Sequence, residues 1–283
     1  MNELNDQLLA VLIDADNISS KSIKNMLTEI SRYGTPTIKR IYGDWTKPDL
    51  IGWKNSLLEH AITPMQQYSY TSGKNSTDSA MIIDAMDILY TAKVDGFCIV
   101  SSDSDFTRLA IRLREAGKMV YGIGERKTPI SFIAACSKFI YVEILGQTEI
   151  DNPDAIKETE VVEASEIAKD KDSEAKTGPV IAKPDKMIRE DLKNLISSSV
   201  SALADEDGWA YLAAVGALIN KKQPEFDSRN YGFQKLTSLL RSLNAFELDE
   251  RTSGTSRSKQ IYVKNHNKLV KPNIRRKKSV KST

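Results

Sequence analysis

The chain has 283 residues, of which 40% are hydrophobic, and it carries 40 Lys and Arg against 38 Asp and Glu. This length accommodates two domains of ordinary size, and the hydrophobic content is enough for real cores. No apolar run approaches the ~18 residues that span a bilayer, and the first residues do not form a signal-peptide pattern. We therefore expect a cytoplasmic protein that does not engage a membrane.

Cysteine and histidine are scarce, with Cys98, Cys136, His60 and His266 as their only examples. Both cysteines lie in apolar surroundings, so we expect buried free thiols and a reducing compartment. Because there is no CxxC motif and no Cys/His cluster, a zinc site is not expected. Any chemistry must depend on carboxylates, hydroxyls, lysines or other metal ions.

Residues 8–146 alternate between strand and helix patterns, beginning with the continuous apolar run Leu8–Asp14. Such a run ending in an acid is typical of a central parallel strand. Further strands are expected at 37–42, 62–68, 97–100, 118–123 and 139–144. Helices are expected at 23–30, 50–59, 77–90, 105–115 and 129–136. This alternation predicts an α/β fold, a parallel sheet with helices on both faces.

Residues 147–186 lose this alternation, since the segment contains no aromatic residue and carries 11 Asp and Glu against 6 Lys and Arg. It cannot bury enough apolar surface to offset its ordering entropy, so we expect a flexible acidic linker.

A second, smaller domain is expected at residues 187–264. Three helices are predicted at 187–203, 209–219 and 230–243, followed by a hairpin of strands 245–248 and 260–263. Three helices and a hairpin predict a small winged-helix-like α+β domain.

The basic C-terminus is the one strong charge block, since residues 264–283 hold eight Lys and Arg and no Asp or Glu. We expect residues 265–283 to form a basic disordered tail that attracts polyanions, nucleic acid first among them. The alternative is a tail that only aids solubility.

Four aspartates are candidate metal ligands and catalytic residues: Asp14, Asp78, Asp103 and Asp105. Asp14 ends the first predicted strand, Asp103 and Asp105 follow the strand at 97–100, and Asp78 lies in the first turn of a helix. The carboxyl ends of parallel strands share one edge of a sheet, where ligands bind in open α/β folds. Carboxylates gathered there repel one another unless a cation lies between them, and such ligands suit Mg²⁺ or Mn²⁺.

Each of these acids also has a purely structural interpretation. Asp14 and Asp16 can cap the helix that begins near Ser19, and Asp103 can cap the helix that follows it. Asp78 can simply favour the helix dipole. Their shared placement at predicted strand ends is what favours a site.

Asn17, Lys74 and Ser101 are the candidate substrate-binding residues and polar support for the acids. Asn17 can hold a carboxylate or a phosphate without adding charge. Lys74 precedes Asp78 and can contact a phosphate or neutralise the acids, or it is an ordinary loop lysine.

Three sequence blocks resemble the signature of the NYN domain, a PIN-like nuclease fold, in its LabA-like group. They are Asp14-Ala15-Asp16-Asn17, Lys74-Asn75-Ser76-Thr77-Asp78 and Ser101-Ser102-Asp103-Ser104-Asp105-Phe106. The resemblance spans roughly residues 8–146, and the order and spacing of all three blocks match. It implies metal-dependent cleavage of mostly single-stranded RNA, with the four aspartates binding the metal.

Two departures from this family concern loop geometry. Many relatives have Gly where this chain has Ser102, and a Gly-Val pair where it has Ser76-Thr77. Both leave the acids in place.

The second domain resembles the LOTUS, or OST-HTH, domain, over roughly residues 187–264. The likeness lies in Trp209-Ala210-Tyr211-Leu212-Ala213-Ala214-Val215-Gly216, Tyr231-Gly232-Phe233-Gln234-Lys235-Leu236 and Phe246-Glu247-Leu248. The resemblance implies RNA binding or protein contacts; the alternative is a generic winged helix. Within it we expect Trp209 and Tyr211 to be core residues rather than surfaces for RNA stacking.

The sequence thus predicts a metal-dependent endoribonuclease that cleaves RNA by metal-activated water, with Mg²⁺ or Mn²⁺ as cofactor and a C-terminal RNA-binding module. One alternative is a non-catalytic RNA-binding regulatory adaptor that keeps the nuclease fold, and another is a phosphatase-like hydrolase. A homodimer, or a protein partner bound by the C-terminal domain, stays open.

Overall fold

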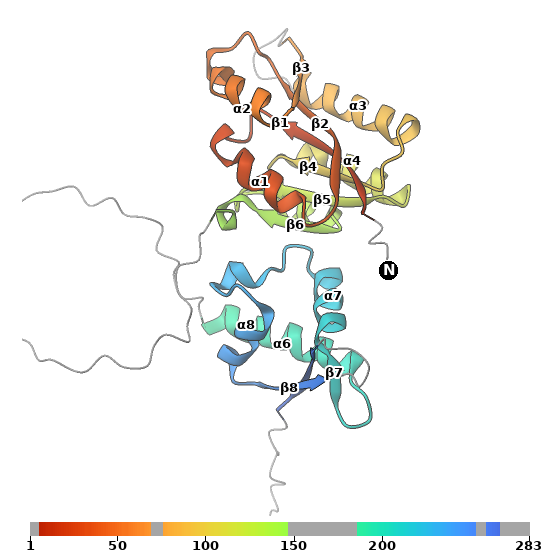
Figure 1. Cartoon of the computed structure of the whole chain (residues 1–283), viewed down its shortest axis with the longest axis vertical. Coiled ribbons are helices and arrows are strands. Elements are labelled where there is room, and N and C mark those ends of the chain that lie inside the picture. Colours follow the sequence, from red (N-terminus) through yellow and green to blue (C-terminus); the bar gives the residue numbers. More distant parts are fainter. Residues whose placement is uncertain (1–5, 69–75, 147–185, 253–258, 267–283) are drawn as a thin grey trace, which may run out of the picture. The chain divides into compact units, whose positions relative to one another are not determined.

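The computed structural model describes residues 6–68, 76–146, 186–252 and 259–266. Two compact units make up the chain, one built on a six-stranded sheet and the other on a three-stranded sheet (Figure 1). Of the predicted linker, the structure describes only Lys186, and of the predicted tail only its first two residues. The rest of both segments lies outside the described residues. Among the helices that the structure describes, none is both long and apolar enough to cross a membrane.

The sheet of the first unit is parallel throughout, which confirms the predicted fold class. Its strand order is β3-β2-β1-β4-β5-β6. The strands are β1 (Leu8–Asp14), β2 (Thr35–Gly43), β3 (Thr63–Gln66), β4 (Gly96–Val100), β5 (Met119–Gly124) and β6 (Lys138–Tyr141).

Helices cover both faces of this sheet (Figure 1). One face packs against α3 (Ser76–Thr91), α4 (Thr107–Glu115) and α5 (Ile130–Ala135). The other packs against α1 (Ile23–Ile30), α2 (Lys54–Glu59) and the 3-10 helix η2 (Pro48–Trp53). Shorter 3-10 turns are η1 (Ser20–Ser22), η3 (Ser104–Phe106) and η4 (Val142–Ile144).

Strand β1 shows why its sequence reads as a continuous apolar run. Leu12 contributes to the core beneath α3 and α4, whereas Val11 and Ile13 contribute to the core beneath α1 and α2. Alternate residues of a strand point to opposite faces, so a strand buried on both sides needs apolar residues throughout. The buried thiols of Cys98 and Cys136 are free, as predicted, and burial raises the pKa of both.

The order of the strands creates a switch point between β1 and β4. From β1 the chain continues to β2 and β3 on one side, then returns through α3 to β4, which pairs with β1 on the other side. Loops that leave such a pair in opposite directions open a crevice at the carboxyl ends of the strands. Ile13 pairs with Val100, so the next residues, Asp14 and Ser101, begin that crevice side by side.

The second unit combines helices with an antiparallel sheet of order β7-β9-β8. Its elements are α6 (Lys186–Leu203), β7 (Trp209–Tyr211), most of α7 (Leu212–Lys222), α8 (Leu236–Leu243), β8 (Phe246–Thr252) and β9 (Lys259–Asn265). The segment Ile219–Gly232, which holds the end of α7 and the 3-10 helix η6 (Ser228–Tyr231), is grouped with the first unit. The predicted three helices and hairpin are present. The prediction was wrong in starting the second helix at Trp209, because residues 209–211 form a third strand.

The third predicted helix also begins later than residue 230. Gly232 adopts a left-handed conformation with φ of 83° directly after η6, and α8 starts only at Leu236. A left-handed glycine ends a helix because its backbone leaves the helical path.

Candidate metal centre

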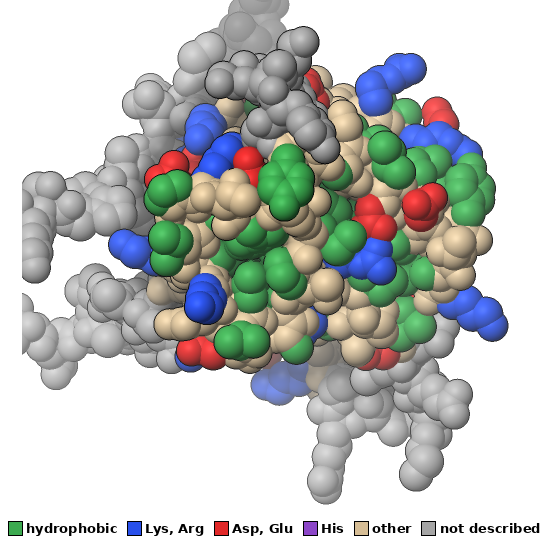
Figure 2. Space-filling model, turned by 90° about the horizontal axis from the view of Figure 1, so that it is seen from above, with side chains coloured by type: hydrophobic (Ala, Val, Ile, Leu, Met, Phe, Trp, Pro, Cys, Tyr) green, Lys and Arg blue, Asp and Glu red, His purple; other side chains and the backbone are tan. Residues whose placement is uncertain are grey.

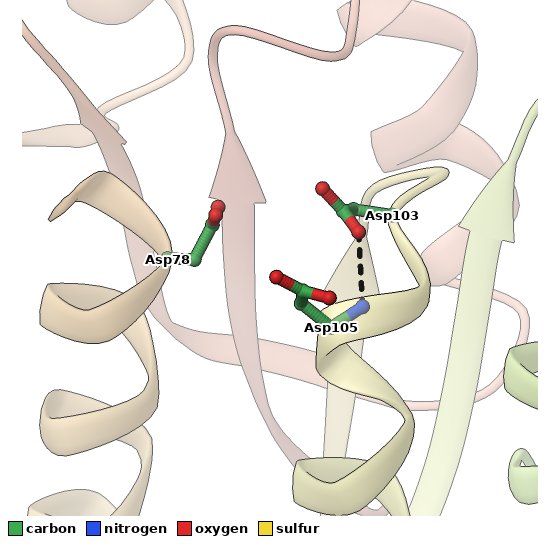
Figure 3. A group of neighbouring side chains, drawn as sticks. All are labelled: Asp78, Asp103 and Asp105. Atoms are coloured by element: carbon green, nitrogen blue, oxygen red, sulfur yellow. Dashed lines mark hydrogen bonds between the residues drawn. The ribbon is translucent and has the colours of Figure 1, made fainter. Parts of the chain in front are cut away.

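Three of the four predicted acids meet at the carboxyl edge of the first sheet. Asp78, Asp103 and Asp105 each offer a carboxylate oxygen, and these oxygens all lie within 4.8 Å of one another. Asp78 reaches from the first turn of α3 toward the loop after β4, which carries the other two acids (Figure 3). The predicted common edge is therefore real for these three residues.

The loop after β4 owes its shape to its own side chains. Asp103 caps η3, because one of its carboxylate oxygens accepts a 2.9 Å hydrogen bond from the backbone N–H of Asp105 (Figure 3). The backbone N–H of Asp103 in turn donates to the hydroxyl of Ser101 at 3.1 Å. The capping interpretation of Asp103 is thus confirmed, and capping leaves a second carboxylate oxygen of this residue to face Asp78.

Asp14 lies deeper than the other acids, with 1% of its surface exposed. Its Oδ2 accepts hydrogen bonds from the amide of Asn17 at 2.6 Å and from the hydroxyl of Ser101 at 2.8 Å. Its Oδ1 accepts from the backbone N–H of Asp16 at 3.1 Å. Burial raises the pKa of Asp14, and these three hydrogen bonds oppose that rise. Asp14 is outside the cluster of three but is held rigidly beside it.

The charges of this edge act most strongly on Asp78. Burial, followed by the charges of Asp14, Asp103, Asp105 and Asp16, raises the pKa of Asp78 to about 6. A carboxyl group whose pKa is raised by the charges of neighbouring carboxylates lies in surroundings that are short of positive charge.

The donor set fits a hard divalent cation. Carboxylate oxygens are the ligands that Mg²⁺ and Mn²⁺ prefer, and Mg²⁺ is usually held by one or two carboxylates with water or phosphate oxygens in its remaining positions. A cation among Asp78, Asp103 and Asp105 would also remove the repulsion that the pKa of Asp78 reports. The residues present are therefore suited to hold Mg²⁺ or Mn²⁺.

The predicted polar support lies around Asp14 rather than around the open cluster. Asn17 is half-buried and Ser101 is fully buried, and both donate to Asp14. The structure thus gives both residues a part in positioning a carboxylate, and contact with a substrate stays a prediction for them. Lys74 lies outside the described residues.

Two hydroxyl groups join the loops of this edge in a way that the sequence did not reveal. Thr77, which is buried, donates to a carboxylate oxygen of Asp16 at 3.4 Å. Ser102 accepts a 2.8 Å hydrogen bond from the backbone N–H of Glu125, in the loop after β5. Both residues lie at positions where the sequence analysis noted a departure from the family that the chain resembles, and each side chain makes a hydrogen bond there.

A second polar group braces α3 against the sheet. Asp84 accepts hydrogen bonds from the guanidinium of Arg40 and from the hydroxyl of Tyr42, both on β2. Burial and the hydrogen bond to Asp84 raise the pKa of Tyr42. Asp84 lies on the same helix as Asp78, so this contact helps to set where α3 presents its first turn. The periodicity of α3 alone gave no signal for it.

One face of the molecule shows how charges of both signs are distributed. On the face that Figure 2 shows, acidic and basic side chains are interspersed among hydrophobic ones, and neither sign forms a continuous block. This agrees with the sequence, in which residues 1–146 carry 16 Lys and Arg against 17 Asp and Glu. The concentration of positive charge lies instead at the C-terminal end of the sequence.

Comparison with known families finds a match for two segments of the chain. Residues 8–145 match the family model of the NYN domain, and residues 183–257 match that of the OST-HTH/LOTUS domain. These matches confirm both resemblances and their order. No significant match was found among curated proteins.

Three solved structures are similar to parts of the chain. A protein of unknown function from Vibrio parahaemolyticus is 20% identical, covers 50% of this chain and 96% of its own, and has a TM-score of 0.41. An uncharacterized protein from Nitrosomonas europaea is 27% identical, with 36% and 91% covered and a TM-score of 0.26. Residues 175–257 of a Chromobacterium violaceum protein are 26% identical, with 30% and 91% covered and a TM-score of 0.24.

Proposed function

We propose that this chain, an NYN domain followed by an OST-HTH/LOTUS domain, is a metal-dependent endoribonuclease that cleaves single-stranded RNA. The observation that carries the proposal is the meeting of Asp78, Asp103 and Asp105 within 4.8 Å at the switch point of a parallel sheet. The NYN domain is a nuclease-type family, and the second domain supports an RNA-related role.

Asp78, Asp103 and Asp105 would hold the Mg²⁺ or Mn²⁺. The bound ion would activate a water molecule and stabilise charge on the phosphoryl group during in-line displacement. Asp78 would bind as the carboxylate, since a cation favours the charged form over the proton that the neighbouring acids favour. Asp103 would serve as cap and ligand together, because its two oxygens can divide these tasks.

Asp14 would act beside these three residues. Asn17, Ser101 and the backbone of Asp16 leave it little freedom to turn. A carboxylate held in this way needs no reorganisation during a reaction, so it can serve as a ligand of the ion or orient a water molecule next to it. We propose that its contribution is a fixed negative charge at the inner end of the site.

The decisive experiment is cleavage of a 5′-labelled, unstructured RNA by the purified full-length chain. We expect cleavage with Mg²⁺ or Mn²⁺ and none with EDTA. Asp78→Asn and Asp103→Asn should each lower the rate by about 100-fold or more, as loss of one charge-stabilising group does in other active sites. Asp87→Asn is the matched control, because Asp87 is an exposed acid on the same helix as Asp78.

The outcomes separate the proposal from its rivals. Cleavage that survives both substitutions would overturn the assignment of the site. RNA binding without cleavage under either ion would favour a regulatory adaptor that keeps the nuclease fold. Hydrolysis of a small phosphate ester without any action on RNA would favour a phosphatase.

A further inference from the structure

The outer face of the three-stranded sheet in the second unit carries three aromatic side chains. Trp209 pairs with Lys264 and Tyr211 with Tyr262 across the antiparallel strands β7 and β9. Alternate residues share a face, so these four side chains project together while Ala210, which is buried, points to the core.

The aromatic rings on this face are accessible and close together. Tyr211 is 43% exposed, and Trp209 and Tyr262 are half-buried. The ring centroids of Tyr211 and Tyr262 lie 5.7 Å apart. The expectation that Trp209 and Tyr211 form part of the core was therefore wrong, because the strand 209–211 buries only its central alanine.

Two cations lie over these rings. The guanidinium of Arg251, on β8, lies 4.4 Å from the ring centroid of Tyr262 and 5.2 Å from that of Trp209. The ammonium of Lys264 lies 5.7 Å from the ring of Trp209. Arg251 also pairs with Asp249 at 2.8 Å, whereas Lys264 forms no ion pair with any residue that the structure describes. A guanidinium plane that covers an aromatic ring offers a further flat surface on its other side.

These features match the chemistry of an unpaired nucleic-acid base. Single-stranded RNA exposes the flat faces of its bases, which stack on aromatic side chains and on arginine planes. A duplex hides the same faces inside its own stack.

Positive charge for the phosphates is supplied by the adjoining sequence. Glu247 and Asp249 lie on this face too, opposite Lys264 and Tyr262, so the face itself carries little net charge. Strand β9 ends at Asn265, and residues 264–283 contain eight Lys and Arg and no Asp or Glu. This charge attracts a nucleic-acid backbone whatever its base sequence.

Helix α8 carries fewer groups that could bind a nucleic acid than the aromatic face does. A winged-helix protein commonly reads a duplex with its recognition helix. Helix α8 has one basic residue, Arg241, and its guanidinium lies 3.9 Å from a carboxylate oxygen of Glu250.

We infer that the outer face of this sheet, formed by Trp209, Tyr211 and Tyr262 with Arg251 and Lys264, binds unpaired RNA bases by stacking. The inference rests on the proposed function in naming RNA as the ligand.

The test uses the full-length chain carrying Asp103→Asn, so that RNA is bound without being cut. Fluorescence anisotropy compares a labelled 12-nucleotide unstructured RNA with a duplex of the same sequence at one salt concentration. Tyr211→Ala should weaken binding of the single strand roughly ten- to hundredfold, the range expected for loss of one stacked base, and leave the duplex unaffected. Tyr211→Phe keeps the ring and should keep the affinity.

Tyr90→Ala is the matched control, since Tyr90 is an exposed tyrosine on α3, some 18 Å along the helix from Asp78. It should leave both affinities unchanged. Removal of residues 267–283 should weaken single-strand and duplex binding alike and flatten their dependence on salt, because it removes phosphate contacts and not stacking. Thermal unfolding checks that every variant is folded.

Equal single-strand affinity in the parent and Tyr211→Ala would overturn the inference, as would an equal loss for duplex and single strand. A parent chain that binds no RNA at all would also overturn it and leave a protein as the partner of this domain. If the chain cleaves RNA but Tyr211→Ala does not change RNA binding, this inference is wrong and the proposed function stands. RNA binding that is weakened by Tyr211→Ala, in a chain that cleaves no RNA, would support this inference and contradict the proposed function.

Discussion

The hydroxyl of Ser101 donates a 2.8 Å hydrogen bond to Oδ2 of Asp14, a residue 87 positions earlier in the chain. The same hydroxyl accepts the backbone N–H of Asp103 at 3.1 Å. One fully buried serine therefore joins the end of β1 to the loop that carries two of the clustered acids. It links the buried carboxylate of Asp14 to the cluster of Asp78, Asp103 and Asp105.

Ser101→Ala should impair both stability and cleavage. The change leaves a buried carboxylate without one donor and a backbone N–H without its acceptor, which costs about 2 kcal/mol of unfolding free energy. Loss of a residue that orients metal ligands typically lowers activity or metal affinity about 10–100-fold. Urea unfolding and the rate of RNA cleavage measure the two effects. Ser104→Ala, at an exposed serine in the same loop, is the control and should change neither.

The metal-free protein should lose stability as Asp78 ionises. The pKa of Asp78 is about 6 in the folded chain, above its ordinary value of 3.8, so between about pH 4 and 6 the folded state binds more protons than the unfolded state. Unfolding free energy therefore falls as pH rises through this window, and the loss is complete above pH 6. We expect a contribution on the order of 1 kcal/mol after screening by solvent, or about 2–4 °C in Tm.

Thermal unfolding in EDTA from pH 4.5 to 7.5 isolates this contribution as the difference between the parent and Asp78→Asn. At pH 7.5 Mg²⁺ should raise the Tm of the parent and have much less effect on the variant, because the ion replaces the missing positive charge. The same pH dependence in both proteins would show that Asp78 is not the group responsible.

The contrast between the two units shows what a sequence pattern can and cannot predict. The strand Leu8–Asp14 was predicted with its observed bounds, because a strand buried on both faces leaves an unbroken apolar run. The strand Trp209–Tyr211 was mistaken for helix, because three residues are too few to show a period of two. Because the apolar residues of α7 follow directly, residues 209–211 were included in the predicted helix.

The site was predictable only as far as strand ends determine it. Asp78, Asp103 and Asp105 meet because parallel strands share one carboxyl edge, and the sequence shows where the strands end. The sequence named Ser101 as polar support for the acids without saying which acid it would hold. Its hydrogen bond with Asp14, and that of Ser102 with Glu125, depend on side-chain geometry between segments far apart in sequence. No local pattern encodes such contacts, so Ser102 was noted only as a departure from its relatives.

Tyr42→Phe should destabilise the first unit while leaving Asp78, Asp103 and Asp105 in place. The change removes a hydrogen bond to the carboxylate of Asp84, which couples β2 to α3. Hydrogen bonds to charged groups contribute about 1.5–3 kcal/mol, so we expect the Tm to fall by roughly 3–10 °C. Tyr90→Phe is the control, because the hydroxyl of Tyr90 contacts Arg112 on an exposed surface. Equal melting of Tyr42→Phe and the parent would show that the contact does not brace α3.

Gly124→Ala should be more harmful than its small change in size suggests. A Cβ at Gly124 would lie 2.7 Å from the carbonyl oxygen of Ser101 and 2.7 Å from Oγ1 of Thr128. A backbone oxygen cannot yield as a flexible side chain can, so the loop that holds Asp14 and Asp103 must shift. Overpacking of this kind costs about 1–3 kcal/mol, and the displaced Ser101 should lower cleavage as well.

Gly216→Ala, in α7 of the second unit, is the matched glycine control. Its Cβ would lie 3.5 Å from Cδ2 of Leu236, an ordinary van der Waals contact. Replacing a helical glycine by alanine stabilises by about 0.5–1 kcal/mol, so this variant should melt at or above the parent temperature and cleave RNA at the parent rate. If Gly124→Ala behaved like Gly216→Ala in both measurements, the close approach of β5 to the Ser101 loop would have no bearing on the candidate metal centre. If only Gly124→Ala lost cleavage while still folded, the loss would trace to the position of Ser101 and the carboxylates it holds.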